Sequence, residues 1–164
     1  MEITAAGGRA AAQWGSLSIA GAFMLDQLTK ALAMASGEAL TRGIEVVPFF
    51  NLVLLRNTGV TFGMFAGQSL GQWPVILFTG AVAAVLGVWL SRASNARQAA
   101  ALGAIIGGAL GNILDRFRLG GVTDFLDFHV AGYHWPAFNF ADTAIVIGVA
   151  TLILTEAVAK QPRS

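Results

Sequence analysis

Four long stretches of this chain are apolar and free of charged side chains. The clearest of them, residues 73–90, contains no Asp, Glu, Lys or Arg. A helix that crosses a membrane needs about 20 consecutive, mainly apolar residues. With their polar ends included, the four stretches predict membrane-spanning helices over about 14–35, 73–91, 98–117 and 139–159.

The two long connections, about 36–72 and 118–138, fall on one side of the membrane because successive spans alternate in direction. The first contains a β-branched and aromatic run, residues 46–55, bounded by glycine and turn residues. This run is too short to span as a helix and predicts a strand or hairpin at the membrane surface. The second connection is expected to be a loop. The fold class is therefore an all-α membrane protein, with residues 1–164 as one integral membrane domain.

Composition supports a membrane protein and excludes several functions. Of the 164 residues, 55% are hydrophobic and 12% charged, whereas soluble domains carry roughly 25% charged residues. The four tryptophans lie near the predicted span ends, as is typical of the membrane interface. A formal net charge of +1 gives no electrostatic basis for nucleic-acid binding. The absence of cysteine excludes disulfides, cysteine metal sites and a cysteine nucleophile.

Charge favours cytoplasmic termini only modestly. Lys and Arg number five on each predicted side, but Arg92 and Arg97 are concentrated in the short 91–97 hairpin on the side of the termini. A cleavable signal peptide is the alternative for the first span, with Ala33-Met34-Ala35 as its cleavage site. Asp26 and Lys30 lie before that site, where such peptides rarely carry charge, so a retained helix is expected.

Small residues recur in the third predicted span. Gly103, Gly107 and Gly111 are spaced by four and form one stripe on a helix. Stripes of this kind let a neighbouring backbone approach closely. We therefore expect a tightly packed helix pair here.

Ionisable and amide side chains near apolar spans indicate function, because they are costly in a membrane. Asp26 and Lys30 are four residues apart and can pair on one helix face; a purely structural ion pair is the alternative. Asn112, Asp115 and Arg116 share a face at the end of the third span. Their donors and acceptors suit holding a peptide backbone; a helix-terminal Asp with a snorkelling Arg is the alternative.

Two further carboxyl groups, Asp124 and Asp142, are 18 residues apart but fall at the same predicted membrane level. Two carboxyls brought close together do not both ionise, so one keeps a proton and the other can act as a base on water. This pairing predicts aspartic proteolysis without metal or cofactor. A small transporter or proton-conducting channel that relays protons through the same carboxyls is the alternative function.

Other catalytic chemistries have weak support in the sequence. His129 and His134 lie near Asp127, but there is no HExxH motif and no convincing third metal ligand. Neither a GxSxG motif nor a phosphate-binding GxxxxGK[ST] motif is present.

Five short blocks together resemble the lipoprotein signal peptidase, or signal peptidase II, family of bacteria. In order they are Asp26-Gln27-Leu28-Thr29-Lys30, Asn57-Thr58-Gly59-Val60-Thr61-Phe62-Gly63, Gly107-Gly108-Ala109-Leu110-Gly111-Asn112 with Asp115-Arg116, Gly121-Val122-Thr123-Asp124-Phe125, and Phe138-Asn139-Phe140-Ala141-Asp142. Only the two tails of the chain lie outside this resemblance.

The resemblance implies a four-helix intramembrane aspartyl endopeptidase of the bacterial plasma membrane, with cytoplasmic termini and an active site at the outer leaflet. Its substrates would be prolipoproteins carrying a diacylglyceryl group, cut just before the lipidated cysteine. Asp124 and Asp142 match the catalytic dyad of the family. The other matching positions line or shape the site: Asn57, Gly59, Asn112, Arg116, Asn139, Asp26, Lys30 and Asp115.

The first connection would correspond to the family's extramembrane β-cradle. Val60-Thr61 departs from the pair of alanines that is more usual in the family, which can alter the room beside the substrate. The expected partners are the lipid-modified prolipoprotein and membrane lipid, and the protein is expected to be a monomer.

Overall fold

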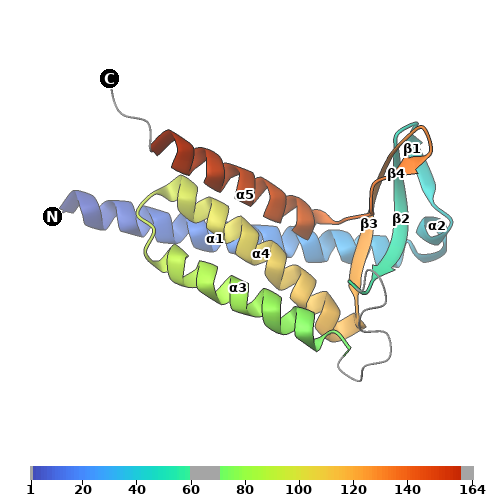
Figure 1. Cartoon of the computed structure of the whole chain (residues 1–164), viewed down its shortest axis with the longest axis horizontal. Helices are drawn as coiled ribbons and strands as arrows, with labels where there is room; N and C mark the ends of the chain where they lie inside the picture. The colour runs from blue at the N-terminus through green and yellow to red at the C-terminus, as the bar shows by residue number, and fades with distance from the viewer. Residues whose placement is uncertain (1, 60–70, 160–164) are drawn as a thin grey trace.

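The computed structural model describes residues 2–59 and 71–159. Within them, four long helices lie side by side and a small sheet lies at one end of the helical group (Figure 1). The helices are α1 (Glu2–Ala35), α3 (Trp73–Ser91), α4 (Ala96–Leu119) and α5 (Phe140–Ala159). The first turns of α1 and the last turns of α5 lie at the end remote from the sheet.

The predicted helix positions are confirmed for three of the four helices. α3 has the predicted bounds, α4 extends two residues beyond the prediction at each end, and α5 begins one residue later. α1 differs, because it begins at Glu2 and not at residue 14. Its first turns are rich in alanine, which has the highest helix propensity, so the helix continues beyond the apolar stretch.

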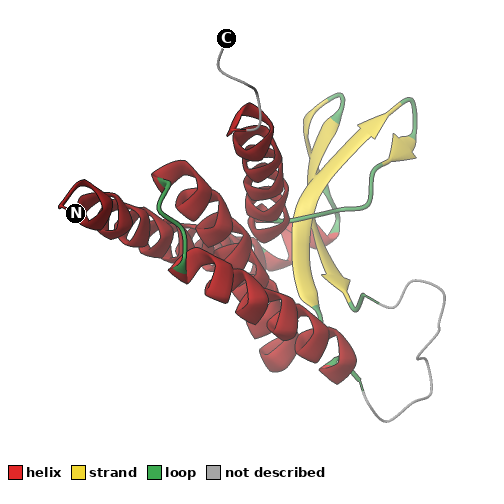
Figure 2. Cartoon of the chain, turned by 60° about the vertical axis from the view of Figure 1, so that its left-hand side comes forward, coloured by secondary structure: helices red, strands yellow, loops and turns green. Residues whose placement is uncertain are grey.

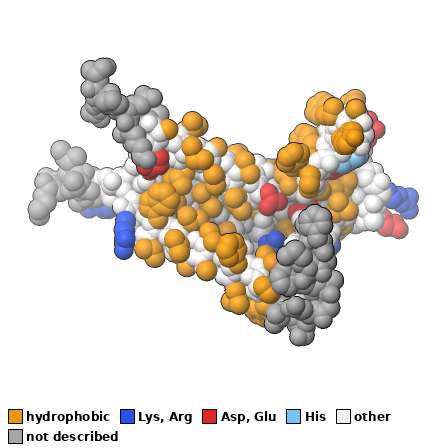
Figure 3. Space-filling view, in the orientation of Figure 1, with side chains coloured by type: hydrophobic (Ala, Val, Ile, Leu, Met, Phe, Trp, Pro, Cys, Tyr) orange, Lys and Arg blue, Asp and Glu red, His pale blue; other side chains and the backbone are white. Residues whose placement is uncertain are grey.

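Three helices among the described residues are long and apolar enough to cross a membrane, namely α3, α4 and α5. α1 is long enough, but Asp26, Gln27 and Lys30 lower the mean hydropathy of its apolar part. Few described side chains of α3 and α5 are buried, and many of the exposed ones are large and apolar. Figure 3 shows hydrophobic side chains over the helical surface and Lys and Arg near its two ends. The chain is therefore a membrane protein.

The central helix is α4, which packs against α1, α3 and α5. Its predicted glycine stripe faces α1. A Cβ atom added at Gly103 or Gly107 would collide with the backbone carbonyl oxygen of Gly15 or Ile19 on α1. The prediction of a tightly packed helix pair is confirmed, because only glycine allows these backbones to come so close.

The described residues also contain a four-stranded antiparallel sheet in the order β1-β2-β3-β4. The strands are β1 (Ile44–Val47), β2 (Phe50–Asn57), β3 (Val122–Val130) and β4 (Tyr133–His134), and a short helix α2 (Gly37–Thr41) precedes them. The hairpin predicted in the first connection is confirmed as β1 and β2.

The prediction of a loop over 118–138 was wrong, because this connection supplies β3 and β4. Residues 126–130 alternate between apolar and polar types, a strand signal that this prediction missed. Before them, the adjacent polar residues Thr123 and Asp124 and the adjacent apolar residues Phe125 and Leu126 break the alternation, so the first half of β3 has no strand pattern of its own. Pairing with β2, which is distant in the sequence, stabilises it instead. Leu55 lies opposite Asp124 in this pairing.

A small apolar core fixes the sheet to the helices. Ala33 near the end of α1, Leu40 of α2 and Phe125 of β3 are buried together. The Phe125 ring also lies 6.0 Å from that of Phe140, at the start of α5. The sheet forms one curved layer beside the helices (Figure 2), and this core brings β3 next to the start of α5.

Candidate active site

The deepest part of the site is an ion-pair network between α1 and α4. The Lys30 ammonium lies 2.9 Å from Asp26 Oδ2 and 3.2 Å from Asp115 Oδ2. Lys30 is 1% exposed and Asp26 0%. The predicted pairing of Asp26 with Lys30 is confirmed, and Asp115 joins it from α4. Burying three charges is costly unless they are paired, as they are here.

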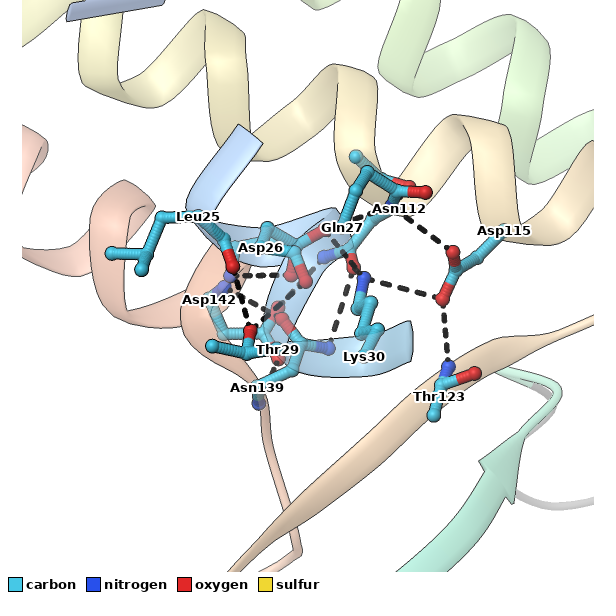
Figure 4. A network of polar contacts seen from close by, with 12 residues as sticks. Leu25, Asp26, Gln27, Thr29, Lys30, Asn112, Asp115, Thr123, Asn139 and Asp142 are labelled. Carbon is cyan, nitrogen blue, oxygen red and sulfur yellow. Dashed lines mark hydrogen bonds and ion pairs between the residues drawn. The ribbon is translucent and has the colours of Figure 1, made fainter. Parts of the chain in front are cut away.

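Asn112 links this network to the start of α5 (Figure 4). Its side-chain oxygen accepts hydrogen bonds from Lys30 Nζ at 2.9 Å and from Asn139 Nδ2 at 3.3 Å. Its Nδ2 donates to Asp142 Oδ1 at 2.9 Å. The Asn112 amide therefore connects a buried cation to a carboxyl group.

Asn139 and Asp142 are joined by two reciprocal hydrogen bonds at the first turn of α5. The Asp142 N–H donates to Asn139 Oδ1 at 3.0 Å, and the Asn139 N–H donates to Asp142 Oδ2 at 3.2 Å. This is the pattern of a capping box, in which two side chains satisfy the free N–H groups of a helix start. The positive end of the helix dipole also favours a negative charge at Asp142.

Asp124 is brought to the same place by β3. It accepts hydrogen bonds from Asn139 Nδ2 at 2.6 Å and from Asn57 Nδ2, at the end of β2, at 2.9 Å. Burial raises the pKa of the Asp124 carboxyl, the amide donors Asn57 and Asn139 oppose this, and the nearby Asp142 raises it further. A raised pKa keeps a proton on the carboxyl at higher pH than usual.

Asn139 thus contacts both carboxyl groups. It donates to Asp124 through its side chain and to Asp142 through its backbone, while its side-chain oxygen accepts from the Asp142 N–H. The side chain of Asn139 is fully buried, so neighbours on several sides hold these contacts in place. The proximity of Asp124 and Asp142 expected from the sequence is therefore found in the structure.

Gly59 and Arg116 lie together beside this group. The Gly59 N–H donates to Asn57 Oδ1 at 2.8 Å, and Gly59 has a φ of +70°, which favours glycine. A Cβ atom added at Gly59 would lie 3.7 Å from Arg116 Nη2. Arg116 Nη1 donates to the backbone oxygen of Asn112 at 3.3 Å. Val60 and Thr61, which depart from the family pattern, lie outside the described residues.

An apolar groove of about 370 Å³ leads from the surface of α5 to Asp142. The groove is lined by Trp135, Phe138, Asp142, Thr143, Val146 and Ile147. Val146 and Ile147 are exposed on the outer face of α5. Asp142 can therefore be reached from the lipid-facing side of the helix, whereas Asp124 is only 2% exposed.

Sequence reasoning did not assign a role to several groups that support the site. Gln27 Nε2 donates to Asp115 Oδ1 at 3.2 Å, and the Thr123 N–H donates to Asp115 Oδ2 at 2.9 Å. The Ala141 N–H donates to Asp26 Oδ1 at 2.9 Å. Gln27 lies between Asp26 and Lys30 in the sequence, and this position could have indicated that it supports their ion pair. Backbone donors carry no such signal, because any residue can supply them.

The two histidines lie farther along the sheet. His134 Nδ1 lies 2.9 Å from both Asp127 carboxyl oxygens, and its ring stacks on that of His129. Partial burial raises the pKa of Asp127, but hydrogen bonds from His134 and Asn51 outweigh this, so the pKa is lowered overall. In residues 2–59 and 71–159, no three His, Asp or Glu side chains are arranged to hold a metal ion.

Two carboxyl groups at one amide, Asp124 on β3 and Asp142 on α5, form the kind of pair that an aspartic hydrolase uses. The apolar helices beside them place this pair in a membrane protein. The chain belongs to the signal peptidase II family, whose family model matches residues 18–158. It is therefore an aspartic peptidase of that family.

Individual relatives and solved structures agree with this assignment. The chain is 44% identical over 154 residues to a lipoprotein signal peptidase of Ralstonia nicotianae, covering 92% of this chain and 87% of that one. It is 46% identical over 137 residues to a lipoprotein signal peptidase of Paraburkholderia phymatum, covering 81% of each. A bacterial membrane enzyme solved by the in meso method at 2.3 Å resolution is similar in fold. Its TM-score is 0.73 at 29% identity, with 92% of this chain and 93% of that one covered.

Proposed function

We propose that the chain removes signal peptides from diacylglyceryl-modified prolipoproteins, cutting before the lipidated cysteine, with Asp124 and Asp142 as its catalytic pair. The observation that carries this proposal is the placement of both carboxyl groups around Asn139. Two carboxyls held at one amide can share a proton and activate water between them.

The environments of the two carboxyl groups suggest different roles in the reaction. Asp142 lies at a helix start and faces the groove, so it acts as the base that takes a proton from water. The water oxygen adds to the carbonyl carbon of the scissile bond, and the proton on buried Asp124 passes to the carbonyl oxygen. Collapse of this tetrahedral diol breaks the C–N bond. The leaving amine takes the proton held by Asp142, and a hydroxyl of the diol returns a proton to Asp124.

The remaining side chains divide between substrate contact and support. Asn57, Asn112 and Asn139 line the site and hold the two carboxyl groups in place. Arg116 supplies donors for the peptide backbone, and Gly59 leaves room beside it. Asp26, Lys30 and Asp115 are buried and support these groups from behind. No step of this mechanism calls for a cofactor.

The proposed membrane arrangement has four spans, with α1 as the first. Exposed apolar side chains along α1 support its contact with lipid, namely Leu17, Met24, Leu28 and Leu32. The start of α1 and the end of α5 lie on the side remote from the sheet. We assign this side to the cytoplasmic face of a bacterial inner membrane. The active site then lies at the outer leaflet. There a monomer receives its lipidated substrate from the bilayer through the groove beside Asp142.

The test is cleavage of a lipid-modified prolipoprotein by the purified protein in lipid nanodiscs. Wild type is expected to release the signal peptide, whereas Asp124→Asn and Asp142→Asn are expected to be inactive. Asp127→Asn is the matched control. Asp127 lies on β3 like Asp124, but it contacts His134 and Asn51 and lies outside the site. Normal cleavage by either dyad variant would refute the proposed pair. Proton flux across vesicles without peptide cleavage would support the transporter instead.

A further inference from the structure

The Lys30 ammonium uses all three of its donors inside the protein. Two go to carboxylates, Asp26 and Asp115, and the third goes to the neutral amide oxygen of Asn112 at 2.9 Å. Lys30 is 1% exposed, so bulk water does not compete for these donors. The third contact is the one that leads toward the carboxyl pair.

An asparagine amide has an acceptor end and a donor end of nearly the same shape, so it can be turned either way. An ammonium group can only donate, so the end of Asn112 that faces Lys30 must be its oxygen. Asn139 Nδ2 donates to the same oxygen at 3.3 Å, which favours the same orientation. The Nδ2 group of Asn112 is therefore left facing Asp142 Oδ1 at 2.9 Å.

We propose that Lys30 is a positioning residue of the peptidase reaction, which acts through the Asn112 amide to keep a hydrogen-bond donor on Asp142. The inference rests on the proposed function of the Asp124 and Asp142 pair. A donated hydrogen bond favours the ionised form of a carboxyl group. Lys30 thereby selects Asp142 as the base of the pair and leaves the shared proton on Asp124.

Other charged groups surround Asp142 as well, and any test has to separate Lys30 from them. They come from three elements, namely Asp26 and Lys30 on α1, Asp115 and Arg116 on α4, and Asp124 on β3. Of these, only Lys30 bonds to the oxygen of Asn112 in the described residues. Substitutions at Lys30 and at Asn112 therefore test the effect of Lys30 on Asp142 apart from that of the other charged groups.

The first test is Lys30→Met, which keeps an unbranched side chain and removes the donors. Without the ammonium, the Asn112 amide can turn its oxygen toward Asp142, which then faces an acceptor in place of a donor. We expect kcat to fall about 10- to 100-fold, with KM within about threefold of wild type, because Lys30 is buried. The acid limb of the pH–rate profile should move to higher pH. An unmoved acid limb would overturn the proposal.

The matched control is Gln27→Met on the same turn of α1. Gln27 Nε2 donates to Asp26 and Asp115, so it supports the same ion pairs. None of its hydrogen bonds in the described part of the chain reaches Asn112. We expect Gln27→Met to lower stability without moving the acid limb. Equal shifts in both variants would show that Lys30 is only structural and would overturn the proposal.

A second variant, Asn112→Asp, keeps the inference testable if Lys30→Met does not fold. The new carboxylate can still accept from Lys30 and Asn139, but it offers no donor to Asp142. The acid limb should again move to higher pH, with kcat lowered about 10- to 100-fold. A wild-type acid limb in Asn112→Asp would overturn the inference. Loss of cleavage in Asp124→Asn and Asp142→Asn in the same assay would show that the proposed function itself still holds.

Discussion

The carboxylate of Asp26, in the C-terminal third of α1, accepts a hydrogen bond from the backbone N–H of Ala141 in the first turn of α5, with an N to O distance of 2.9 Å. The other oxygen of Asp26 pairs with Lys30. One buried side chain therefore joins the ion-pair network to the helix start that carries Asp142. Gly111 on α4 packs directly against this carboxylate, because an added Cβ atom would collide with it.

Replacing Asp26 by asparagine is expected to reduce stability. The variant keeps an oxygen for the Ala141 N–H but removes a charge from the buried pair with Lys30. Removing one partner of a buried ion pair costs about 3–5 kcal/mol when the other charge is left uncompensated. Lys30 keeps Asp115 as a carboxylate partner, so the lower end of that range is expected. The free energy of unfolding in detergent, measured by denaturant titration, should fall by that order. A change below about 1 kcal/mol would contradict a buried pair.

A substitution at Gly107 should separate α1 from α4. Gly107→Ala would place a Cβ atom against the backbone of Ile19, and overpacking of this kind costs about 1–3 kcal/mol. Gly21→Ala is the matched control on α1, because no atom of the described chain lies within 4 Å of its added Cβ. Thermal unfolding in detergent should show a lower midpoint for Gly107→Ala only. Equal midpoints for the two variants would rule out the close helix contact.

The pH dependence of cleavage should report the raised pKa of Asp124. In the proposed mechanism Asp124 donates its proton, so the rate should fall on the alkaline side as pH rises through this raised pKa. The amide of Asn57 donates to Asp124 and favours its ionised form, which lowers the pKa. Asn57→Ala should therefore raise the pKa further and move the alkaline limb to higher pH. A shift to lower pH would contradict the role of Asp124 as the acid.

Asp127 should make the stability of the sheet sensitive to acid. Its pKa is lowered in the folded protein, since hydrogen bonds from His134 and Asn51 outweigh the opposing effect of burial. The unfolded chain then binds a proton more readily, so this contribution to stability is present above about pH 4 and is lost as pH falls through the folded pKa. Asp127→Asn should weaken the acid dependence of the unfolding midpoint between about pH 5 and 3. An unchanged dependence would mean that other carboxyl groups govern it.

The helices and the pairing of Asp26 with Lys30 were predictable from the sequence because both depend on local spacing. An uncharged apolar stretch long enough for a membrane predicts a helix, and α3 has the predicted bounds. Residues four apart on a helix lie on one face, so Asp26 and Lys30 were expected to pair. The hairpin of β1 and β2 has a similarly local signal in its β-branched run.

Long-range pairing decided the rest. Only residues 126–130 of β3 alternate between apolar and polar types, and hydrogen bonds to β2 extend the strand back to Val122. That pairing places Asp124 beside Asn57, and the start of α5 places Asn139 between Asp124 and Asp142. The sequence by itself determined which residues are candidates for the chemistry and which stretches are apolar, since these follow from residue type and spacing. Only the tertiary structure decided which donor faces which carboxyl oxygen, because hydrogen bonds act over about 3 Å between segments far apart in the chain.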